Sequence, residues 1–278
     1  MKKHKIARLV VLGNPYENNP KRLLNKFIKQ NDDKHFEFVI TPGGFLEFDF
    51  PDALQGNVKI DVDKIDDKQL QLLIEKAKSE ISSFFKSLRK SRYEKLKEIA
   101  DYITIGIDGY NSTGKRGVEL IAIYSLKETK VIRWTGKFYP TERQKRRLIK
   151  FNDLESHFIE LNNQKVLILG CHDLNAYSPR GQAVAKPRGY KKEIAKKIRS
   201  LNKKYQPDIV LQHPHTTDTP NIWSQPWNAL VKELPSVKHY ASAINYFNWN
   251  GQQRRDLDTV LEKTKQGDVV DFYYKSIF

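Results

Sequence analysis

A single cysteine lies where an apolar run ends. Residues 165–175 read KVLILGCHDLN, and the uncharged run 166–170 stops at Cys171, the only cysteine in the chain. A short apolar run of this kind is typical of a strand buried on both faces, and open α/β sheets place their chemistry at such strand ends. A thiol there can attack an electrophile if its pKa is lowered or a base takes its proton. The alternative is a buried, inert cysteine that fills a small gap.

Other residues of catalytic type follow neighbouring predicted strands. Lys137 comes just after a predicted strand at 130–134, and His213 and His215 follow another at 208–212, which should end on the same edge as Cys171. A lysine at a strand end can stabilise a developing negative charge, or it can be a solvated surface cation. A histidine beside a thiol can help to form the thiolate, or it can simply line a polar pocket.

The composition indicates a folded protein of a reducing compartment. Of 278 residues, 39% are hydrophobic, which suits one domain with a sizeable core. One cysteine excludes an internal disulfide. No apolar run approaches the length of a membrane span, and Arg8 interrupts the first apolar segment, which is too short for a signal peptide. We therefore expect a cytoplasmic protein with no membrane partner.

The charge is strongly positive. Lysine and arginine number 49 against 33 acidic residues, a formal net charge of +16. Such an excess attracts nucleic acid or another polyanion, suits an acidic protein partner, or reflects only a lysine-rich proteome. The basic runs at 143–147 and 186–204 fall mostly on predicted helices and loops. We therefore predict that the basic surface is peripheral to any pocket at the strand ends.

Strands and helices succeed one another in a way that predicts one α/β domain. Residues 45–50 are predicted to form an aromatic and acidic loop, which either contacts a pocket or partner or packs its phenylalanines beneath itself. Predicted helices cover 20–29, 70–88, 190–205, 227–233 and 257–264, and predicted strands cover 6–12, 36–40, 102–107, 118–124, 130–134, 157–161, 165–170, 208–212 and 238–247.

The order of these parts resembles the nitrilase superfamily of carbon–nitrogen hydrolases. That resemblance implies a four-layer α-β-β-α sandwich in which a glutamate, a lysine and a cysteine each follow a strand. It extends over residues 5–247 of the single predicted domain 1–278 and leaves 248–278 as a divergent tail. The segments that carry it are VITPGGFL at 39–46, WTGK at 134–137, ILGCHDL at 168–174 and YASAIN at 240–245.

Two departures from the family pattern affect the expected chemistry. Gly43 occupies the position of the family's general-base glutamate. The family's closing Gly-x-Ser strand and Asp-Pro turn are not found after residue 247. A supporting glutamate usually follows the lysine, and Glu142 is the candidate. Removing a positioned base typically costs about 10²–10⁴-fold in rate, so another group must replace it or the activity is weak or absent.

The resemblance implies a role for each candidate residue. Cys171 is the nucleophile, and Lys137 and the backbone N–H of His172 stabilise the oxyanion. Glu142 orients the lysine. Glu47 is the first candidate for a relocated base and His213 the second, with His172 and His215 as further alternatives. The candidate binding residues are His172, Asp173, His215 and, in a Trp- and Pro-rich loop, Trp223.

Three classes of function stay open. The first is an amidase-type hydrolase of small amides or nitriles that needs no cofactor and no metal. The second is an inactive nitrilase-fold protein that binds a ligand, nucleic acid or a protein partner through its basic surface, and either could be a homo-oligomer. The third is a metal-dependent hydrolase, because Cys171, His172, Asp173, His213 and His215 are metal-competent residue types, although they lack a standard ligand spacing.

The resemblance also makes a geometric prediction. Cys171 and Lys137 are far apart in sequence, but both follow strands that the family places side by side. We therefore predict that they line one pocket, at the direct-contact range that oxyanion stabilisation requires.

Overall fold

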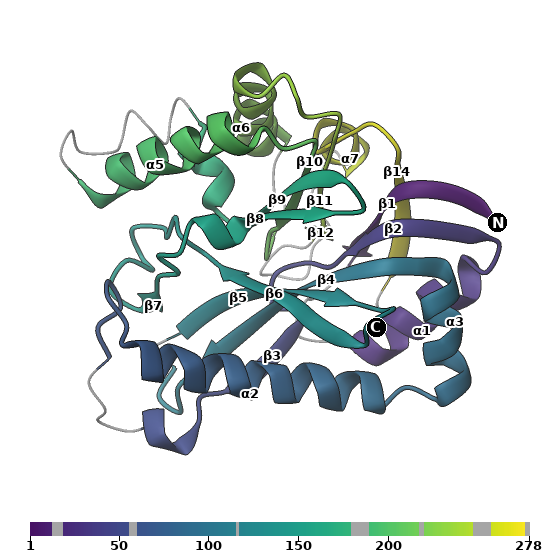
Figure 1. Cartoon of the computed structure of the whole chain (residues 1–278), viewed down its shortest axis with the longest axis horizontal. Coiled ribbons are helices and arrows are strands. Elements are labelled where there is room, and N and C mark those ends of the chain that lie inside the picture. The colour runs from purple at the N-terminus through teal and green to yellow at the C-terminus, as the bar shows by residue number, and fades with distance from the viewer. Residues whose placement is uncertain are drawn as a thin grey trace.

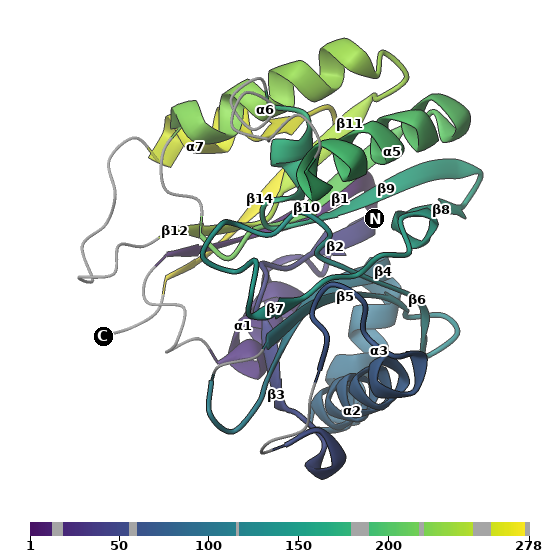
Figure 2. The same cartoon turned by 90° about the vertical axis from the view of Figure 1, so that its left-hand side faces the viewer.

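Two β-sheets stacked face to face form the centre of the molecule, and helices cover both outer faces (Figure 1, Figure 2). The computed structural model describes residues 1–12, 19–55, 60–114, 117–178, 189–216, 220–246 and 257–275. This is the predicted four-layer α-β-β-α sandwich.

The larger sheet has the strand order β12-β1-β2-β4-β5-β6, with β14 beside β1, β3 beside β4 and β7 beside β5. The pairs β1–β2 and β2–β4 are parallel, whereas β4–β5 and β5–β6 are antiparallel. The strands are β1 (Lys2–Leu12), β2 (Lys34–Ile40), β3 (Leu46–Asp49), β4 (Ala100–Tyr110), β5 (Gly117–Ser125), β6 (Lys130–Gly136), β7 (Leu148–Ile149), β12 (Ile244–Tyr246) and β14 (Val269–Lys275).

The smaller sheet has the order β13-β11-β10-β9-β8. Its central pairs, β9–β10 and β10–β11, are parallel, and β8 and β9 form an antiparallel hairpin. The strands are β8 (Phe158–Leu161), β9 (Gln164–Gly170), β10 (Ile209–His213), β11 (His239–Ser242) and β13 (Lys265–Gln266).

The helices lie in two separate outer layers, which Figure 2 shows above and below the sheets. The larger sheet is covered by α1 (Pro20–Gln30), α2 (Asp67–Lys86) and α3 (Lys90–Ile99), and the smaller sheet by α5 (Tyr190–Tyr205), α6 (Pro220–Glu233) and α7 (Leu257–Lys263). Asn19 caps α1 by accepting from the Arg22 N–H, as its position predicts. Within the described ranges, no helix combines the length and apolar composition that a bilayer span needs.

Three apolar clusters separate the four layers. One lies between the sheets and joins Phe38 and Ile121 of the larger sheet to Ile168 and Leu211 of the smaller. The other two bury the inner faces of the helices against each sheet. Strands β9 and β10 are therefore buried on both faces, which explains their uninterrupted apolar sequences.

Three parts of the chain differ from the predicted elements. Residues 46–49 form strand β3 rather than a loop, because exposed Glu47 and Asp49 alternate with buried Phe48. The predicted strand 238–247 is divided at Ala243, so that β11 joins the smaller sheet and β12 the larger. The C-terminal stretch supplies β14, which runs parallel to β1.

A buried arginine fixes that C-terminal strand. The Arg8 side chain on β1 is fully buried and forms an ion pair with Asp271 of β14. It also donates to the carbonyl oxygens of Leu261 and Thr264 and to the Thr264 hydroxyl. Since a buried charge is stable only when paired and hydrogen-bonded, Arg8 makes β1, β14 and the end of α7 interdependent.

We predict that Asp271→Asn lowers the free energy of unfolding by about 3–5 kcal/mol, because it leaves the Arg8 charge buried without its partner. Urea unfolding followed by circular dichroism measures the change. Asp258→Asn, which removes an exposed carboxylate from α7, is the matched control. Equal stability of the two variants would show that the ion pair contributes little.

Candidate active site

The ends of strands from both sheets enclose one cavity of about 300 Å³. Cys171 and Lys137 both line it, as predicted. The cavity lies where β9 and β10 of the smaller sheet approach β4, β5 and the ends of β2 and β6 of the larger one. Its lining residues are Gly43, Gly44, Glu47, Asp108, Tyr110, Glu119, Lys137, Gln144, Cys171, His172, His215, Thr216 and Asn245.

Asp173 holds the turn that contains Cys171 against the segment that follows Lys137. One carboxylate oxygen accepts the N–H groups of Phe138 and Tyr139 at 3.1 and 2.7 Å, and the other accepts that of Gly170 at 2.7 Å. The side chain is fully buried. Asp173 was predicted to be a binding residue. Its contacts show instead that it positions the backbone.

A second buried contact fixes the other side of the cysteine. The Gln212 side-chain amide of β10 donates to the Cys171 carbonyl oxygen at 2.9 Å, and its own carbonyl accepts from the Ser242 hydroxyl at 2.6 Å. Trp227 donates its indole N–H to the same hydroxyl. This buried network ties the cysteine to the neighbouring strands β10 and β11.

Glu119, rather than Glu142, is the carboxylate partner of the lysine. The Lys137 ammonium donates to both Glu119 carboxylate oxygens, at 3.0 and 2.8 Å, and to the Gln144 side-chain oxygen at 2.8 Å. Glu142 is exposed and pairs with Lys191 at 2.7 Å. The prediction for Glu142 was wrong because Glu142 does not line the cavity, whereas Glu119 of β5 does.

These contacts keep the buried lysine charged. Burial alone would lower the pKa of Lys137, but the charge of Glu119 and its hydrogen bonds raise that pKa above its usual value. Burial also opposes ionisation of Glu119, and the Lys137 charge overcomes it and lowers the Glu119 pKa. The cavity therefore holds a charged ammonium, fixed by Glu119 and Gln144, in the same lining as the Cys171 thiol.

His215 occupies the space beside Gly43. A Cβ atom at Gly43 would lie 2.8 Å from both Cε1 and Nδ1 of the His215 ring. The ring Nε2 is 2.6 Å from the Asp108 carboxylate, and the His215 backbone N–H donates to the Cys171 sulfur at 3.3 Å. An imidazole with an orienting carboxylate therefore stands beside the thiol, where the family pattern would have a glutamate side chain.

Glycines make this approach possible. A Cβ on Gly106 of β4 would lie 2.4 Å from the Pro42 carbonyl oxygen and 2.7 Å from the Gly43 Cα. The segment after β2 can therefore pack directly on β4. The Gly43 N–H then donates to the Pro214 carbonyl oxygen at 3.0 Å, which fixes the His215 turn on the same segment.

The charges in the cavity favour a thiolate and an imidazolium. Burial alone would raise the pKa of the Cys171 thiol, but the charge of His172, hydrogen bonds from His172 and His215, and the Lys137 charge lower it well below its ordinary value. Burial would lower the pKa of His215, but the charges of Asp108 and Glu119 raise it well above the ordinary value. The two shifts support each other, as in a Cys–His ion pair.

The other histidine of that turn lies outside the cavity. The His213 ring is buried, its Nδ1 is 2.7 Å from the Thr41 carbonyl oxygen, and burial lowers its pKa to about 4. A neutral ring engaged with backbone is a structural element. Of the two histidines on this turn, His215 therefore lines the cavity and His213, the second candidate base, does not.

Of the remaining candidates, two line the cavity and one lies behind it. Glu47 and His172 are lining residues. The Trp223 ring stacks on that of His172 at a centroid distance of 6.3 Å and belongs to the core beneath α5 and α6. Trp223 thus supports His172 rather than lining the cavity.

Sequence reasoning missed Asp108, Glu119 and Gln144. Glu119 had a signal, since it is the only charged residue in the predicted strand 118–124 and a carboxylate inside an apolar strand needs a partner. Asp108 stands at the end of a predicted strand, as Cys171 does. Gln144 lies within the basic run 143–147 and had no distinguishing feature.

The structure gives no support to the metal alternative. In the part of the chain that is described, no three His, Cys, Asp or Glu side chains are arranged to hold a metal ion. Asp173 is engaged by backbone N–H groups and His213 by a backbone carbonyl. The five residues proposed for a metal site therefore do not converge.

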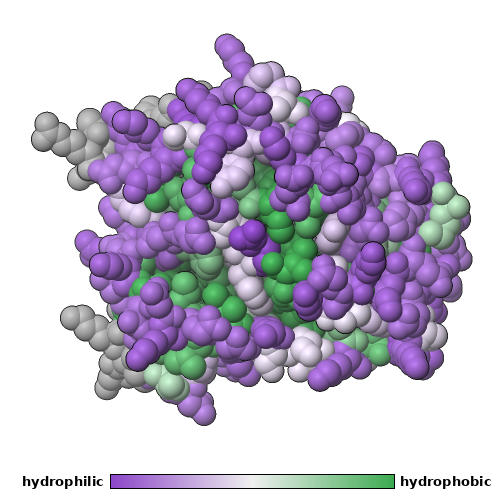
Figure 3. Space-filling view, in the orientation of Figure 1, coloured by the Kyte–Doolittle hydropathy of each residue, from purple (hydrophilic) through white to green (hydrophobic). Residues whose placement is uncertain are grey.

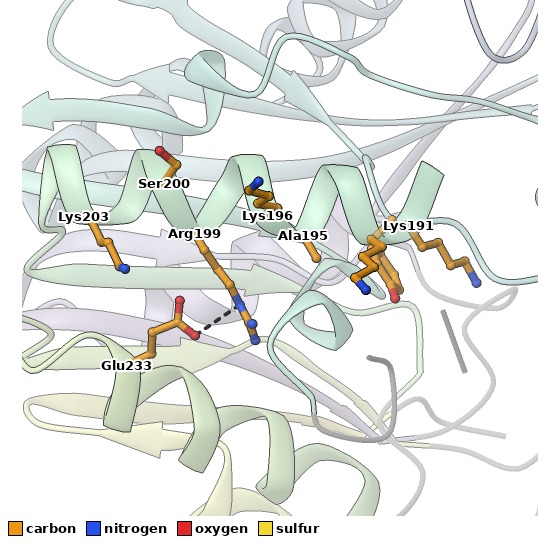
Figure 4. Close-up of a pocket in the computed structure, with 9 residues that line it drawn as sticks. Lys191, Ala195, Lys196, Arg199, Ser200, Lys203 and Glu233 are labelled. Carbon is orange, nitrogen blue, oxygen red and sulfur yellow. Dashed lines mark ion pairs between the residues drawn. The ribbon is translucent and has the colours of Figure 1, made fainter. Parts of the chain in front are cut away.

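The basic surface has its own groove on the outer helix layer. A hollow of about 660 Å³ lies along α5 and is lined by Lys191, Lys192, Lys196, Arg199 and Lys203, with Glu233 opposite (Figure 4). It shares no lining residue with the Cys171 cavity. Hydrophilic side chains cover most of the face in Figure 3, with apolar residues visible mainly in its central hollows.

Comparisons with known proteins identify the fold. The sequence matches no family model and no curated protein. A CN-hydrolase superfamily protein from Xanthomonas campestris, solved with an arsenic adduct in its active site, aligns with a TM-score of 0.50 and 11% identity over 90% of this chain and 78% of its own. The chain thus has the fold of the nitrilase superfamily, which is the fold that the resemblance in the sequence implies.

Two further structures are similar at lower TM-scores. An amidase from Nesterenkonia sp. aligns over 91% of this chain and 80% of its own, with 11% identity and a TM-score of 0.48. A glutamine-dependent NAD+ synthetase from Acinetobacter baumannii aligns over 88% of this chain at 16% identity and a TM-score of 0.47, and the chain covers 39% of that protein.

We predict that Gly43→Ala slows alkylation of Cys171 by iodoacetamide at pH 7 about tenfold or more, because the added methyl group displaces the His215 ring and the thiolate loses its partner. Gly117→Ala is the matched control, since its Cβ would meet neighbours only at 3.4 Å or beyond. An alkylation rate for Gly43→Ala equal to that of the control would show that the ring position does not matter to the thiol.

Proposed function

We propose that this protein is an amidase-type carbon–nitrogen hydrolase in which Cys171 is the nucleophile and His215, oriented by Asp108, replaces the family's general-base glutamate. The observation that carries the proposal is the His215 ring in the space beside Gly43, in contact with Asp108 and next to the Cys171 sulfur. The substrate is a small amide or nitrile, in keeping with a cavity of about 300 Å³.

The residues divide acyl transfer into two steps. The Cys171 thiolate attacks the amide carbon, a C–S bond forms, and the carbonyl π electrons move to the oxygen. The resulting oxyanion is stabilised by the Lys137 ammonium and by the backbone N–H of His172. The intermediate then collapses, the C–N bond breaks, and His215 donates its proton to the departing nitrogen, which leaves as an amine.

Hydrolysis of the thioester completes the cycle. His215, now neutral, takes a proton from water as the water oxygen attacks the acyl carbon. The C–S bond breaks, the acid leaves, and the thiolate and imidazolium are restored. Asp108 holds the imidazole through both steps and stabilises its positive charge, as an orienting carboxylate does in other hydrolases. Glu119 and Gln144 keep Lys137 in place and charged.

We predict that iodoacetamide alkylates Cys171 at a rate nearly independent of pH between about 6.5 and 8.5, because a thiol whose pKa is depressed is already a thiolate there. The titratable groups that face the thiol are His172, His215 and Lys137. In His215→Asn, which keeps His172 and Lys137, rapid alkylation should begin at a higher pH than in wild type, closer to the free-thiol value of about 8.5. The chain has one cysteine, so mass spectrometry follows the reaction without ambiguity.

Two controls separate the candidate bases. His213→Asn should keep the wild-type pH profile, since its ring faces Thr41 rather than the cavity. Asp108→Asn should shift the profile in the direction of His215→Asn. If wild type and all three variants titrate together near pH 8.5, the thiol has no base and the protein is not a cysteine hydrolase.

The basic groove favours a second candidate function, a nitrilase-fold protein that binds a polyanion. Among described residues, only two of the five cations that line it pair with carboxylates, Lys191 with Glu142 and Arg199 with Glu233. Lys192, Lys196 and Lys203 recur along one stretch of helix at intervals of four and seven residues, which places them on the same face of α5. Such a face attracts phosphate groups.

We predict that a fluorescein-labelled single-stranded 20-mer of DNA or RNA binds weakly, and that raising the salt from about 0.05 to 0.2 M largely abolishes binding. Lys196→Glu/Lys203→Glu should weaken binding more than Lys68→Glu/Lys86→Glu on α2, which lies on the opposite face (Figure 2). Tight binding that persists at high salt and is lost in Cys171→Ala would favour the nucleic-acid function over the hydrolase.

A further inference from the structure

Glu47 stands at the entrance of the Cys171 cavity without a cationic partner. Its side chain is exposed, whereas Cys171, which lines the same cavity, is only 4% exposed. Among the residues that the structure describes, no lysine or arginine forms an ion pair with Glu47. The carboxylate is therefore available to whatever enters the cavity.

The pairing of strands β3 and β4 places a second carboxylate next to that of Glu47. Glu47 of β3 is the register partner of Asp108 of β4, so the two acidic residues are neighbours across parallel strands. Like charges at such positions are destabilising. The negative charge of Asp108 is compensated by His215 at 2.6 Å. Among the described residues, the negative charge of Glu47 has no such cationic partner. A strand pairing that costs stability at a cavity entrance is typical of a functional requirement.

The other charges of the cavity leave Glu47 unbalanced. Glu119 pairs with Lys137, and Asp108 pairs with His215. A thiolate at Cys171 adds a further negative charge. Burial and the Asp108 charge raise the pKa of the Glu47 carboxyl, and the His215 charge opposes them. A positive charge brought in from solvent would therefore be stabilised beside Glu47.

Two other roles for Glu47 fit these contacts less well. As the general base it would need the space beside Gly43 and the thiol, which the His215 ring fills. As a purely structural residue it would be expected to have an ion pair or hydrogen bond that fixes it, and no described residue supplies one. Recognition of a ligand is the role that its exposure and position allow.

We propose that Glu47 selects substrates that carry a positive charge, so that the substrate class is a small amide or nitrile bearing a protonated amine or a guanidinium group. The reactive carbon lies at Cys171 and the cationic group at the entrance, against the Glu47 carboxylate. Tyr110, which donates to Asp108 at 3.0 Å, also lines the cavity and would supply an aromatic ring to the cation. This inference rests on the proposed function, since it takes Cys171 as the reacting atom.

The test uses three thiol reagents of different charge on the full chain. These are the cationic 2-(trimethylammonium)ethyl, the anionic 2-sulfonatoethyl and the neutral methyl methanethiosulfonates. In each reaction the Cys171 thiolate attacks the sulfenyl sulfur, a disulfide forms and methanesulfinate leaves. Each rate is divided by the rate of the same reagent with free 2-mercaptoethanol, and the readout is the ratio of the cationic to the anionic value.

Wild type should favour the cationic reagent, although the chain as a whole carries +16. Glu47→Gln should lower the ratio on the order of five- to tenfold, the effect of one charge at short range in a partly solvated site. Asp49→Asn is the matched control, because it removes an exposed carboxylate two residues along β3 that does not line the cavity. Its ratio should stay within about twofold of wild type.

The experiment can disprove the role of Glu47 without disproving the proposed hydrolase function. Equal ratios in wild type and Glu47→Gln, or an equal loss in Asp49→Asn, would overturn the role of Glu47 even if Cys171 reacts rapidly with the neutral reagent. A pH profile of the neutral reagent that follows a free thiol in wild type would instead overturn the hydrolase proposal. The measured ratio would still decide whether Glu47 attracts cations to the cavity.

Discussion

The close approach of the His215 ring to Gly43 is the constraint on which the site depends. A single methyl group at position 43 would lie 2.8 Å from the ring, so a glutamate side chain at 43 and the imidazole of His215 cannot share this space. The glycine at position 43 and the position of the His215 imidazole therefore depend on each other. The same arrangement also requires a glycine at position 106, because only without a Cβ there can the segment that contains Gly43 pack directly on β4.

The two stacked sheets explain how residues from distant parts of the chain meet at this point. Cys171 and His215 follow adjacent parallel strands of the smaller sheet, while Asp108, Glu119 and Lys137 come from the larger one. Asp173 bonds the turn after β9 to the segment after β6, and so joins the sheets at the cavity. The buried polar contacts thus position Cys171, His215 and Lys137 with respect to one another, which is the preorganisation that the proposed catalysis requires.

Much of this could be predicted from the sequence, and the failures have a common cause. Apolar runs and strand ends indicated one α/β domain, because burial on both faces is visible in a strand's own residues. The sandwich, and the shared pocket of Cys171 and Lys137, were implied by the resemblance to the nitrilase superfamily. The choice of Glu119 over Glu142, and of His215 over His213, depends on side-chain direction at contacts between strands far apart in sequence. Strand β14 was missed because its pairing with β1 depends on Arg8, more than 260 residues earlier. Glu47 was assigned to a loop, although the alternation of buried and exposed positions from 46 to 49 is that of a strand.

The ionisation of Cys171 gives the most direct test of the claim that His215 has taken the place of the missing glutamate. The thiolate absorbs near 240 nm, and the difference in absorbance between wild type and Cys171→Ser can be followed from about pH 4 to 9, because the chain has a single cysteine. A thiolate–imidazolium pair predicts that the signal is fully developed well below the free-thiol pKa of about 8.5 and moves toward that value in His215→Asn. A signal that appears only near pH 8.5 in wild type would contradict it.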